Sequence, residues 1–246
     1  MIAGLRSALI LGWMRVLPAR HNPVAYALVF LYPLFFAVAL SAIGGNRFTH
    51  AVIMGLPVAY MFNNGIIALP QLIVDYKVRK LQDMFVASPV GSIAYMFGAA
   101  FSRLLFVMPV ILAVCLAMIA LGQYPVLAIG TLCIVLLCAW MTGCAIGFGL
   151  STYWTDSMQI GAVANLLGML TSVLPPVLYP LDVLPAGWSG WLLLIPSVSA
   201  AHLIRIAGGA TELTGPIHLW AAWAAMLGWT GLCLLAVAYK SRWREP

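Results

Sequence analysis

The residue types that perform acid–base, nucleophilic or metal chemistry are few in this chain and scattered along it. The four histidines, His21, His50, His202 and His218, lie far apart near the ends of apolar stretches, which gives neither a Ser-His-Asp arrangement nor a set of metal ligands. No Gly-x-x-x-x-Gly-Lys-Ser/Thr phosphate-binding loop is present. We therefore assign no catalytic, cofactor-binding or metal-binding residue. A membrane-embedded enzyme that uses His202 or Asp182 stays an alternative.

The acidic residues between the apolar stretches all fall in predicted loops. They are Asp75, Asp83, Asp156, Asp182 and Glu212. Proton-driven carriers generally need Asp, Glu or His within the membrane as proton relays. A self-contained proton-driven carrier is therefore disfavoured, whereas a passive channel or another secondary carrier is a second alternative.

The polar side chains that we single out within apolar stretches are Asn63, Asn64, Asn165 and Arg103. Each allows two interpretations. The three amides either line a transport path or hydrogen-bond neighbouring helices. Arg103 either attracts an anionic head group to the entrance of that path or extends to the lipid phosphates.

These residues must be positioned by membrane helices, because 64% of the 246 residues are apolar and only 7% are charged. A soluble domain carries about 25% charged residues. The sequence predicts an all-α, polytopic membrane protein that forms a single transmembrane domain over residues 1–246. Its six predicted transmembrane helices cover about 24–43, 51–74, 92–121, 126–151, 158–178 and 217–239.

Several features flank or interrupt these spans. Residues 1–22 predict a cytoplasmic interfacial helix, and the proline- and tryptophan-rich residues 179–216 predict outer re-entrant helices. The polar and kinking residues of the second span indicate that it faces protein. Gly143 and Gly147 have the spacing that allows close packing of a neighbouring helix. The five cysteines lie within apolar runs, which indicates helix packing.

The positive charges set the orientation. With the N-terminus inside, only Arg47 and Arg205 among the lysines and arginines fall on the outer face. Both termini are therefore predicted to be cytoplasmic, in the cytoplasmic (inner) membrane. Because the net charge of +6 is explained by this bias, we expect no nucleic-acid partner. The predicted inner residues are Arg6, Arg15, Arg20, Lys77, Arg79, Lys80, Lys240, Arg242 and Arg244.

The cytoplasmic segment 75–91 is the best candidate for contact with a soluble partner. An apolar stripe at helical spacing runs along it, formed by Val74, Val78, Leu81 and Phe85. Asp75 and Arg79 have the i,i+4 spacing of a helix-stabilising pair. We expect Lys77, Arg79, Lys80 and Asp83 to project into water, with Met84 and Phe85 filling a partner's pocket and Ser88-Pro89 ending the helix. The alternative is a solvated helix that rests on the lipid headgroups.

Two regions resemble the ABC-2 type transporter permeases. The first is the run Lys80-Leu81-Gln82-Asp83-Met84-Phe85-Val86-Ala87-Ser88-Pro89-Val90, followed by Tyr95, Gly98 and Arg103. The second contains Tyr179-Pro180-Leu181, Leu184-Pro185, Trp188, Ile195-Pro196 and Arg205.

The resemblance implies the membrane subunit of an ATP-binding cassette exporter. The first region would be the coupling helix that docks on a separate ATPase subunit, which binds ATP and Mg²⁺, with Asp75 and Asp83 as candidates for the family's acidic residue. A second permease copy, most simply a homodimer, would complete the complex. The transported class would be a hydrophobic drug, a lipid or a lipid-linked glycan.

Overall fold

The computed structural model describes residues 23–86, 92–154, 156–180, 183–185, 188–209 and 216–240, which form helices and no strands. The predicted interfacial helix 1–22 lies outside these residues. The long helices are α2 (Pro23–Asn63), α5 (Ser92–Ala120), α6 (Ile129–Tyr153) and α10 (Pro216–Lys240). The shorter α-helices are α3 (Leu69–Val78), α4 (Leu81–Val86), α7 (Ser157–Gly168), α8 (Ser189–Leu192) and α9 (Pro196–Ala207). Three further turns are the π-helical η1 (Asn64–Ala68) and η3 (Met169–Val173) and the 3₁₀-helical η2 (Val126–Ala128).

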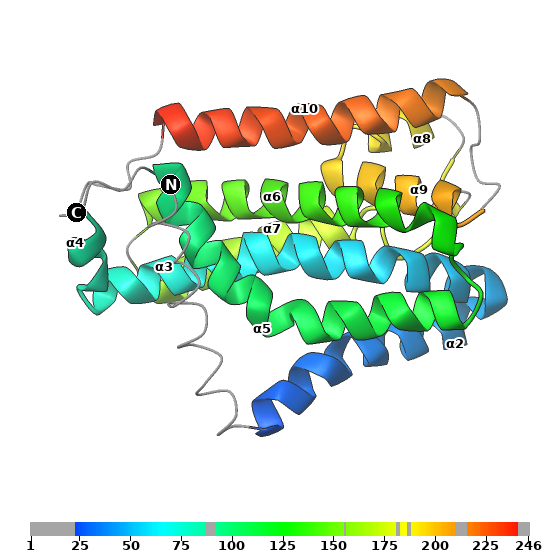
Figure 1. Cartoon of the computed structure of the whole chain (residues 1–246), viewed down its shortest axis with the longest axis horizontal. Coiled ribbons are helices and arrows are strands. Elements are labelled where there is room, and N and C mark those ends of the chain that lie inside the picture. Colours follow the sequence, from blue (N-terminus) through cyan, green and yellow to red (C-terminus); the bar gives the residue numbers. More distant parts are fainter. Residues whose placement is uncertain are drawn as a thin grey trace.

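Helix α2 is interrupted at Gly45, whose φ of 65° lies in the left-handed region. Glycine adopts this conformation readily because it has no Cβ. The chain direction reverses here, as the blue-to-cyan ribbon in Figure 1 shows. The interruption falls between the first two predicted spans, 24–43 and 51–74.

Four stretches of the described chain are long and apolar enough to cross a bilayer: Phe48–Val78, Tyr95–Ala120, Val126–Tyr153 and Leu219–Tyr239. They coincide with the second, third, fourth and sixth predicted spans. Ser157–Val173, at the position of the fifth, is a shorter apolar helix. The protein is therefore an all-α membrane protein with several crossings, whereas the total of six stays a prediction.

Helix α6 lies at the centre of the packing and contacts α2, η1, α3, α9 and α10. A Cβ on Gly147 would lie 2.3 Å from the carbonyl oxygen of Gly65, and one on Gly143 would lie 2.5 Å from that of Phe62. Such distances leave no room for a side chain, so the backbones of α6 and the α2–η1 segment are in direct contact. The predicted packing face at Gly143 and Gly147 is confirmed.

The long helices differ in how much of their surface the protein covers. In Phe48–Val78, 67% of an 18-residue apolar stretch is buried inside the protein. The corresponding share is 22% in both Tyr95–Ala120 and Leu219–Tyr239. The prediction that the second span faces protein is therefore confirmed. Leu116 on α5 and Leu232 on α10 are both 64% exposed, as expected for side chains that contact lipid tails.

Helix α9 is buried among α2, α6 and α10. Arg205 was expected on the outer face, but it is only 1% exposed. Its guanidinium donates to the carbonyl oxygens of Pro176 (3.1 Å), Val177 (2.6 Å) and Ala51 (3.4 Å). Because α9 folds into the bundle, carbonyl oxygens replace water around the charge, and the outer placement of Arg205 stays a prediction. Residues 179–216 do contain the short helices α8 and α9, and their re-entrant course stays a prediction.

We expect Gly147→Leu to lower the melting temperature of the detergent-purified protein, because the new side chain would meet the rigid backbone at Gly65. Overpacking of this kind typically costs about 1–3 kcal/mol. Gly149→Leu is the matched control, since a Cβ at Gly149 on the same helix would meet no atom within 4 Å. Equal melting temperatures for the two variants would contradict the packing described here.

Candidate functional site

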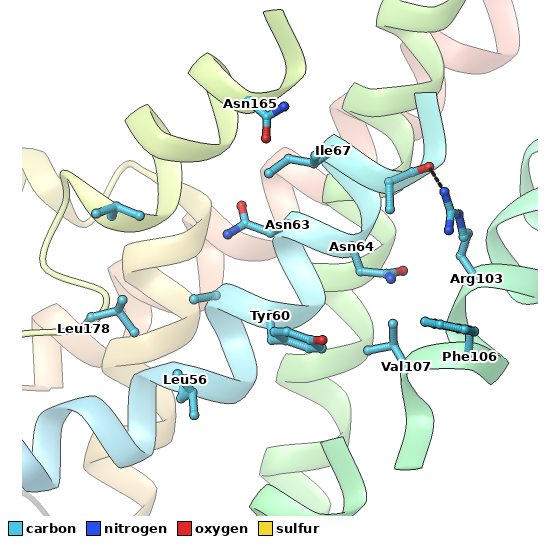
Figure 2. Close-up of a pocket in the computed structure, with 13 residues that line it drawn as sticks. Leu56, Tyr60, Asn63, Asn64, Ile67, Arg103, Phe106, Val107, Asn165 and Leu178 are labelled. Atoms are coloured by element: carbon cyan, nitrogen blue, oxygen red, sulfur yellow. Dashed lines mark hydrogen bonds between the residues drawn. The ribbon is translucent and has the colours of Figure 1, made fainter. Parts of the chain in front are cut away.

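A cavity of about 400 Å³ follows one face of α2 and η1, between α5 on one side and the α7–η3 segment on the other. Figure 2 shows the side chains that line it. The lining residues are Leu56, Ala59, Tyr60, Asn63, Asn64, Ile67, Ala68, Arg103, Phe106, Val107, Asn165, Val173 and Leu178. The wall is therefore mostly apolar with a few polar groups, and the volume lies within the range of about 300–1,000 Å³ typical of ligand sites.

The four polar residues singled out from the sequence, Asn63, Asn64, Asn165 and Arg103, all line this cavity. They come from α2, η1, α7 and α5 respectively. The structure therefore brings them together around one space, and their part in transport stays a prediction.

Two of these residues also connect helices. Asn63 Oδ1 accepts a hydrogen bond of 2.9 Å from Ser172 Oγ of η3. The guanidinium of Arg103 on α5 donates to the carbonyl oxygen of Ala68 at 3.1 Å, which is the dashed line in Figure 2. Both helix-connecting bonds lie at the edge of the cavity, so these side chains hold its walls in place.

The two remaining amides differ in their surroundings. Asn165 is exposed and donates to the carbonyl oxygen of Gly161 in its own helix at 2.7 Å. Asn64 is only 8% exposed, and its Oδ1 has no hydrogen-bond partner. A buried carbonyl-type oxygen without a donor is costly. Asn64 is therefore a polar residue of this wall whose amide oxygen the protein leaves without a hydrogen bond.

The π-helical turns η1 and η3 both contribute to the cavity wall, and each is followed closely by a proline, Pro70 or Pro175. Proline has no N–H, so it cannot donate to the carbonyl four residues earlier. For Pro175 that carbonyl belongs to Thr171, and Ser197 Oγ of α9 donates to it instead. Wide turns of this kind are frequent at functional sites.

The segment after η3 closes one side of the cavity through Leu178. Its backbone lies directly on α2, because a Cβ on Gly55 would be 1.8 Å from the carbonyl oxygen of Val177. Arg205 holds the same segment through the carbonyl oxygens of Pro176 and Val177. The buried arginine thus fixes this wall against α2.

The predicted docking segment begins at the end of the helical stretch that lines the cavity. Helix α3 ends at Val78, and Lys80 adopts a left-handed φ of 57° before α4 begins at Leu81. The expected continuous apolar stripe is therefore wrong, since a left-handed residue ends a helix. Val74 is fully buried, whereas Val78 is 65% and Leu81 39% exposed.

The predicted contact residues of this segment are only partly described. Asp75 and Arg79 form the expected i,i+4 ion pair, with 2.8 Å between Arg79 Nε and Asp75 Oδ1. Lys80 and Asp83 are exposed. Helix α4 also includes Met84 and Phe85. Ser88 and Pro89 lie outside the described residues.

Lys77 does not project into water as expected. Its Nζ donates to the carbonyl oxygen of Ser151 at 2.9 Å, and Ser151 itself is fully buried. The long lysine side chain reaches a carbonyl near the C-terminal end of α6, where donors within the helix run out. The expectation was wrong for this reason, and the start of the docking segment is tied to α6.

A comparison with protein families matches most of the chain. The family model described as ABC-2 type transporter covers residues 7–207. The chain belongs to the ABC-2 type transporter family. It is therefore the membrane subunit, or permease, of an ABC transporter, which works with an ABC ATPase subunit. Among curated proteins, none matches this permease.

Some residues of the permease's cavity were not identified from the sequence. Three of them are Tyr60, Phe106 and Leu178, which line the cavity. In the sequence they do not differ from the other apolar residues of the predicted spans. Ser172 is 109 residues away from Asn63, its hydrogen-bond partner. In the sequence, only the proline after each wide turn pointed to this region. A proline indicates a distorted helix, but it does not predict which residues pack against that helix.

We expect Arg205→Met to lower the stability of the permease by about 3 kcal/mol, because it removes the donor to three buried carbonyl oxygens. Arg205→Lys should recover only part of the loss, since an ammonium cannot reproduce the planar fork of the guanidinium. Thermal unfolding of both purified variants measures this. Wild-type stability of Arg205→Met would show that the arginine does not hold this wall.

Proposed function

We propose that this permease is the membrane half of an exporter that moves a hydrophobic drug, a lipid or a lipid-linked glycan outward across the cytoplasmic membrane. ATP and Mg²⁺ bind to the separate ATPase subunit, and a second copy of the permease completes the complex with six spans from each copy. The family match supports the transporter role. The largely apolar wall of the cavity supports a hydrophobic substrate.

The observation that carries this proposal is the continuity between the cavity and the docking segment. The helical stretch Phe48–Val78 holds Asn63 and Asn64 at the cavity and Asp75 close to its end. Asn64 and Asp75 are separated by about 16 Å of helix. A displacement of α3 by the ATPase therefore moves the cavity wall directly, whereas α4 acts on α3 across the turn at Lys80.

ATP can drive export only if the ATPase binds one conformation of the permease more tightly than the other. The α3–α4 segment is suited to contact the ATPase differently in the two conformations. Its exposed Val78 and Leu81 offer apolar contact, and exposed Arg79, Lys80 and Asp83 offer charge. We propose that closure of the ATPase subunits shifts this segment and changes the spacing between η1 and the α7–η3 segment.

The proposed orientation rests on the distribution of basic residues. Lys77, Arg79 and Lys80 gather at the α3–α4 end of the bundle, and Figure 1 shows the C-terminal end of α10 at that end as well. Basic residues are retained on the cytoplasmic side. This supports cytoplasmic termini and an ATPase that approaches from the cytoplasm.

We expect Phe85→Ala and Asp83→Arg to leave the permease inserted in the membrane but to release its ATPase. Loss of an interface anchor costs about 2 kcal/mol, or roughly thirtyfold in affinity. The measurement is a mild-detergent pull-down of the tagged permease from its native membrane, with mass spectrometry and an ATPase assay.

Gln159→Arg is the control for this experiment, because it adds charge to an exposed position of α7 outside the α3–α4 segment. It should retain the ATPase. Normal retention of the ATPase by both Phe85→Ala and Asp83→Arg would refute the docking assignment.

The direction of transport is tested in inside-out vesicles that contain the permease and its ATPase. We expect a hydrophobic fluorescent substrate to accumulate inside only when ATP and Mg²⁺ are supplied outside. Accumulation that is independent of nucleotide would instead identify a channel or carrier.

A further inference from the structure

The buried amide of Asn64 is the starting point. Its Oδ1 is buried without a hydrogen-bond donor, in a residue that is 8% exposed and lines the cavity. Asn64 also begins the π-helical turn η1. A buried acceptor that lacks a donor is unfavourable in the empty protein and becomes favourable when a ligand supplies an O–H or N–H group.

The charge of the cavity wall is a second, independent observation. Arg103 carries a positive charge, and none of the described residues that line the cavity is acidic. Arg103 lies about 12 Å along the helix from Tyr95, where the apolar stretch of α5 begins. In such a weakly polar environment a positive wall attracts an anionic group and repels a cationic one.

The arrangement of the two groups restricts the ligand further. Figure 2 shows Asn64 directed towards α5, the helix that carries Arg103, with Leu56 and Leu178 away from both residues. Asn64 and Leu56 are separated by about 12 Å along α2. Asn64 and Arg103 thus lie on the same side of the cavity, apart from the apolar side chains of Leu56 and Leu178.

We propose that the cavity binds an anionic amphiphile whose head group also carries a hydrogen-bond donor. This donor bonds to Asn64 Oδ1, and the anionic group lies beside Arg103. The apolar chain lies along α2 towards Leu56 and Leu178. This assignment rests on the proposed export function and names the chemical class of its substrate. It excludes cationic amphiphiles, although their apolar bodies would fit the same wall.

N-dodecanoylglycine is a suitable probe, because its head has an amide N–H next to a carboxylate. Three relatives change one property each. N-dodecanoylsarcosine replaces the N–H by N–CH₃, N-dodecanoylglycinamide removes the charge, and N-dodecanoylethylenediamine carries a positive charge. A diazirine-bearing form of N-dodecanoylglycine, cross-linked to the permease–ATPase complex in nanodiscs and mapped by mass spectrometry, reports occupancy of the site.

We expect cross-links within residues 56–68 and 103–107, displaced by unlabelled N-dodecanoylglycine. The sarcosine and glycinamide relatives should compete about tenfold less well, the loss expected for one buried hydrogen bond or one close charge. The ethylenediamine relative should compete least. This comparison uses the unaltered protein, so it does not depend on the folding of any variant.

Variants assign the two preferences to residues. Asn64→Leu should abolish the preference for glycine over sarcosine, and Arg103→Gln should abolish the preference for carboxylate over amide. Gln159→Leu is the control, because Gln159 is exposed on α7 and does not line the cavity. It should change neither preference.

Equal competition by all four compounds, or cross-links only elsewhere, would overturn the assignment. If the ATPase co-purifies and the complex shows no head-group preference, this inference fails and the export proposal stands. Selective cross-linking in a permease that retains no ATPase would instead support the binding site and contradict the proposed export.

Discussion

The direct contact between the backbones of η1 and α6 is the constraint on which the rest of the permease depends. In lipid, apolar side chains gain little by leaving the solvent, so helices associate mainly through close packing. The backbones of η1 and α6 approach so closely at Gly65, Gly143 and Gly147 that no side chain would fit between them. Residues two positions apart on a helix lie on nearly opposite faces. Because Gly65 faces α6, Asn63 and Ile67 are turned towards the cavity.

The prolines beside the cavity interrupt the helical hydrogen bonds and leave backbone carbonyl groups without their usual donors. Lipid cannot donate to these carbonyls, but other helices of the bundle do. Ser197 donates to Thr171, and Arg205 donates to the two residues that follow Pro175. Both donors lie on α9, which explains why so polar a helix is buried in an apolar protein. The irregular backbone persists because protein, rather than lipid, surrounds it. The wide turns of the cavity wall therefore require α9 in its observed place.

Periodicity and composition predicted the helical fold, the separation of the spans 24–43 and 51–74, and the packing face of α6, because each depends on local spacing. No local pattern predicts that four polar residues line one cavity, because this depends on contacts between distant segments. The four residues are Asn63, Asn64, Asn165 and Arg103. Lys77 illustrates the same limit: a lysine next to other charges predicts exposure, yet a carbonyl at the end of α6 lies within its reach. The left-handed Lys80 was also unpredictable, since only glycine and asparagine signal that conformation.

The packing also determines which parts of the permease can move relative to one another. A displacement at α4 passes into the helical stretch Phe48–Val78 and, through Lys77 and Ser151, into α6. Because α6 and η1 touch backbone to backbone, they cannot be compressed and must move as one body. The α5 and α7–η3 walls face this body across the cavity and are joined to it by hydrogen bonds from Arg103 and Ser172. We propose that those bonds break and reform during transport, so that a rigid movement changes the shape of the cavity.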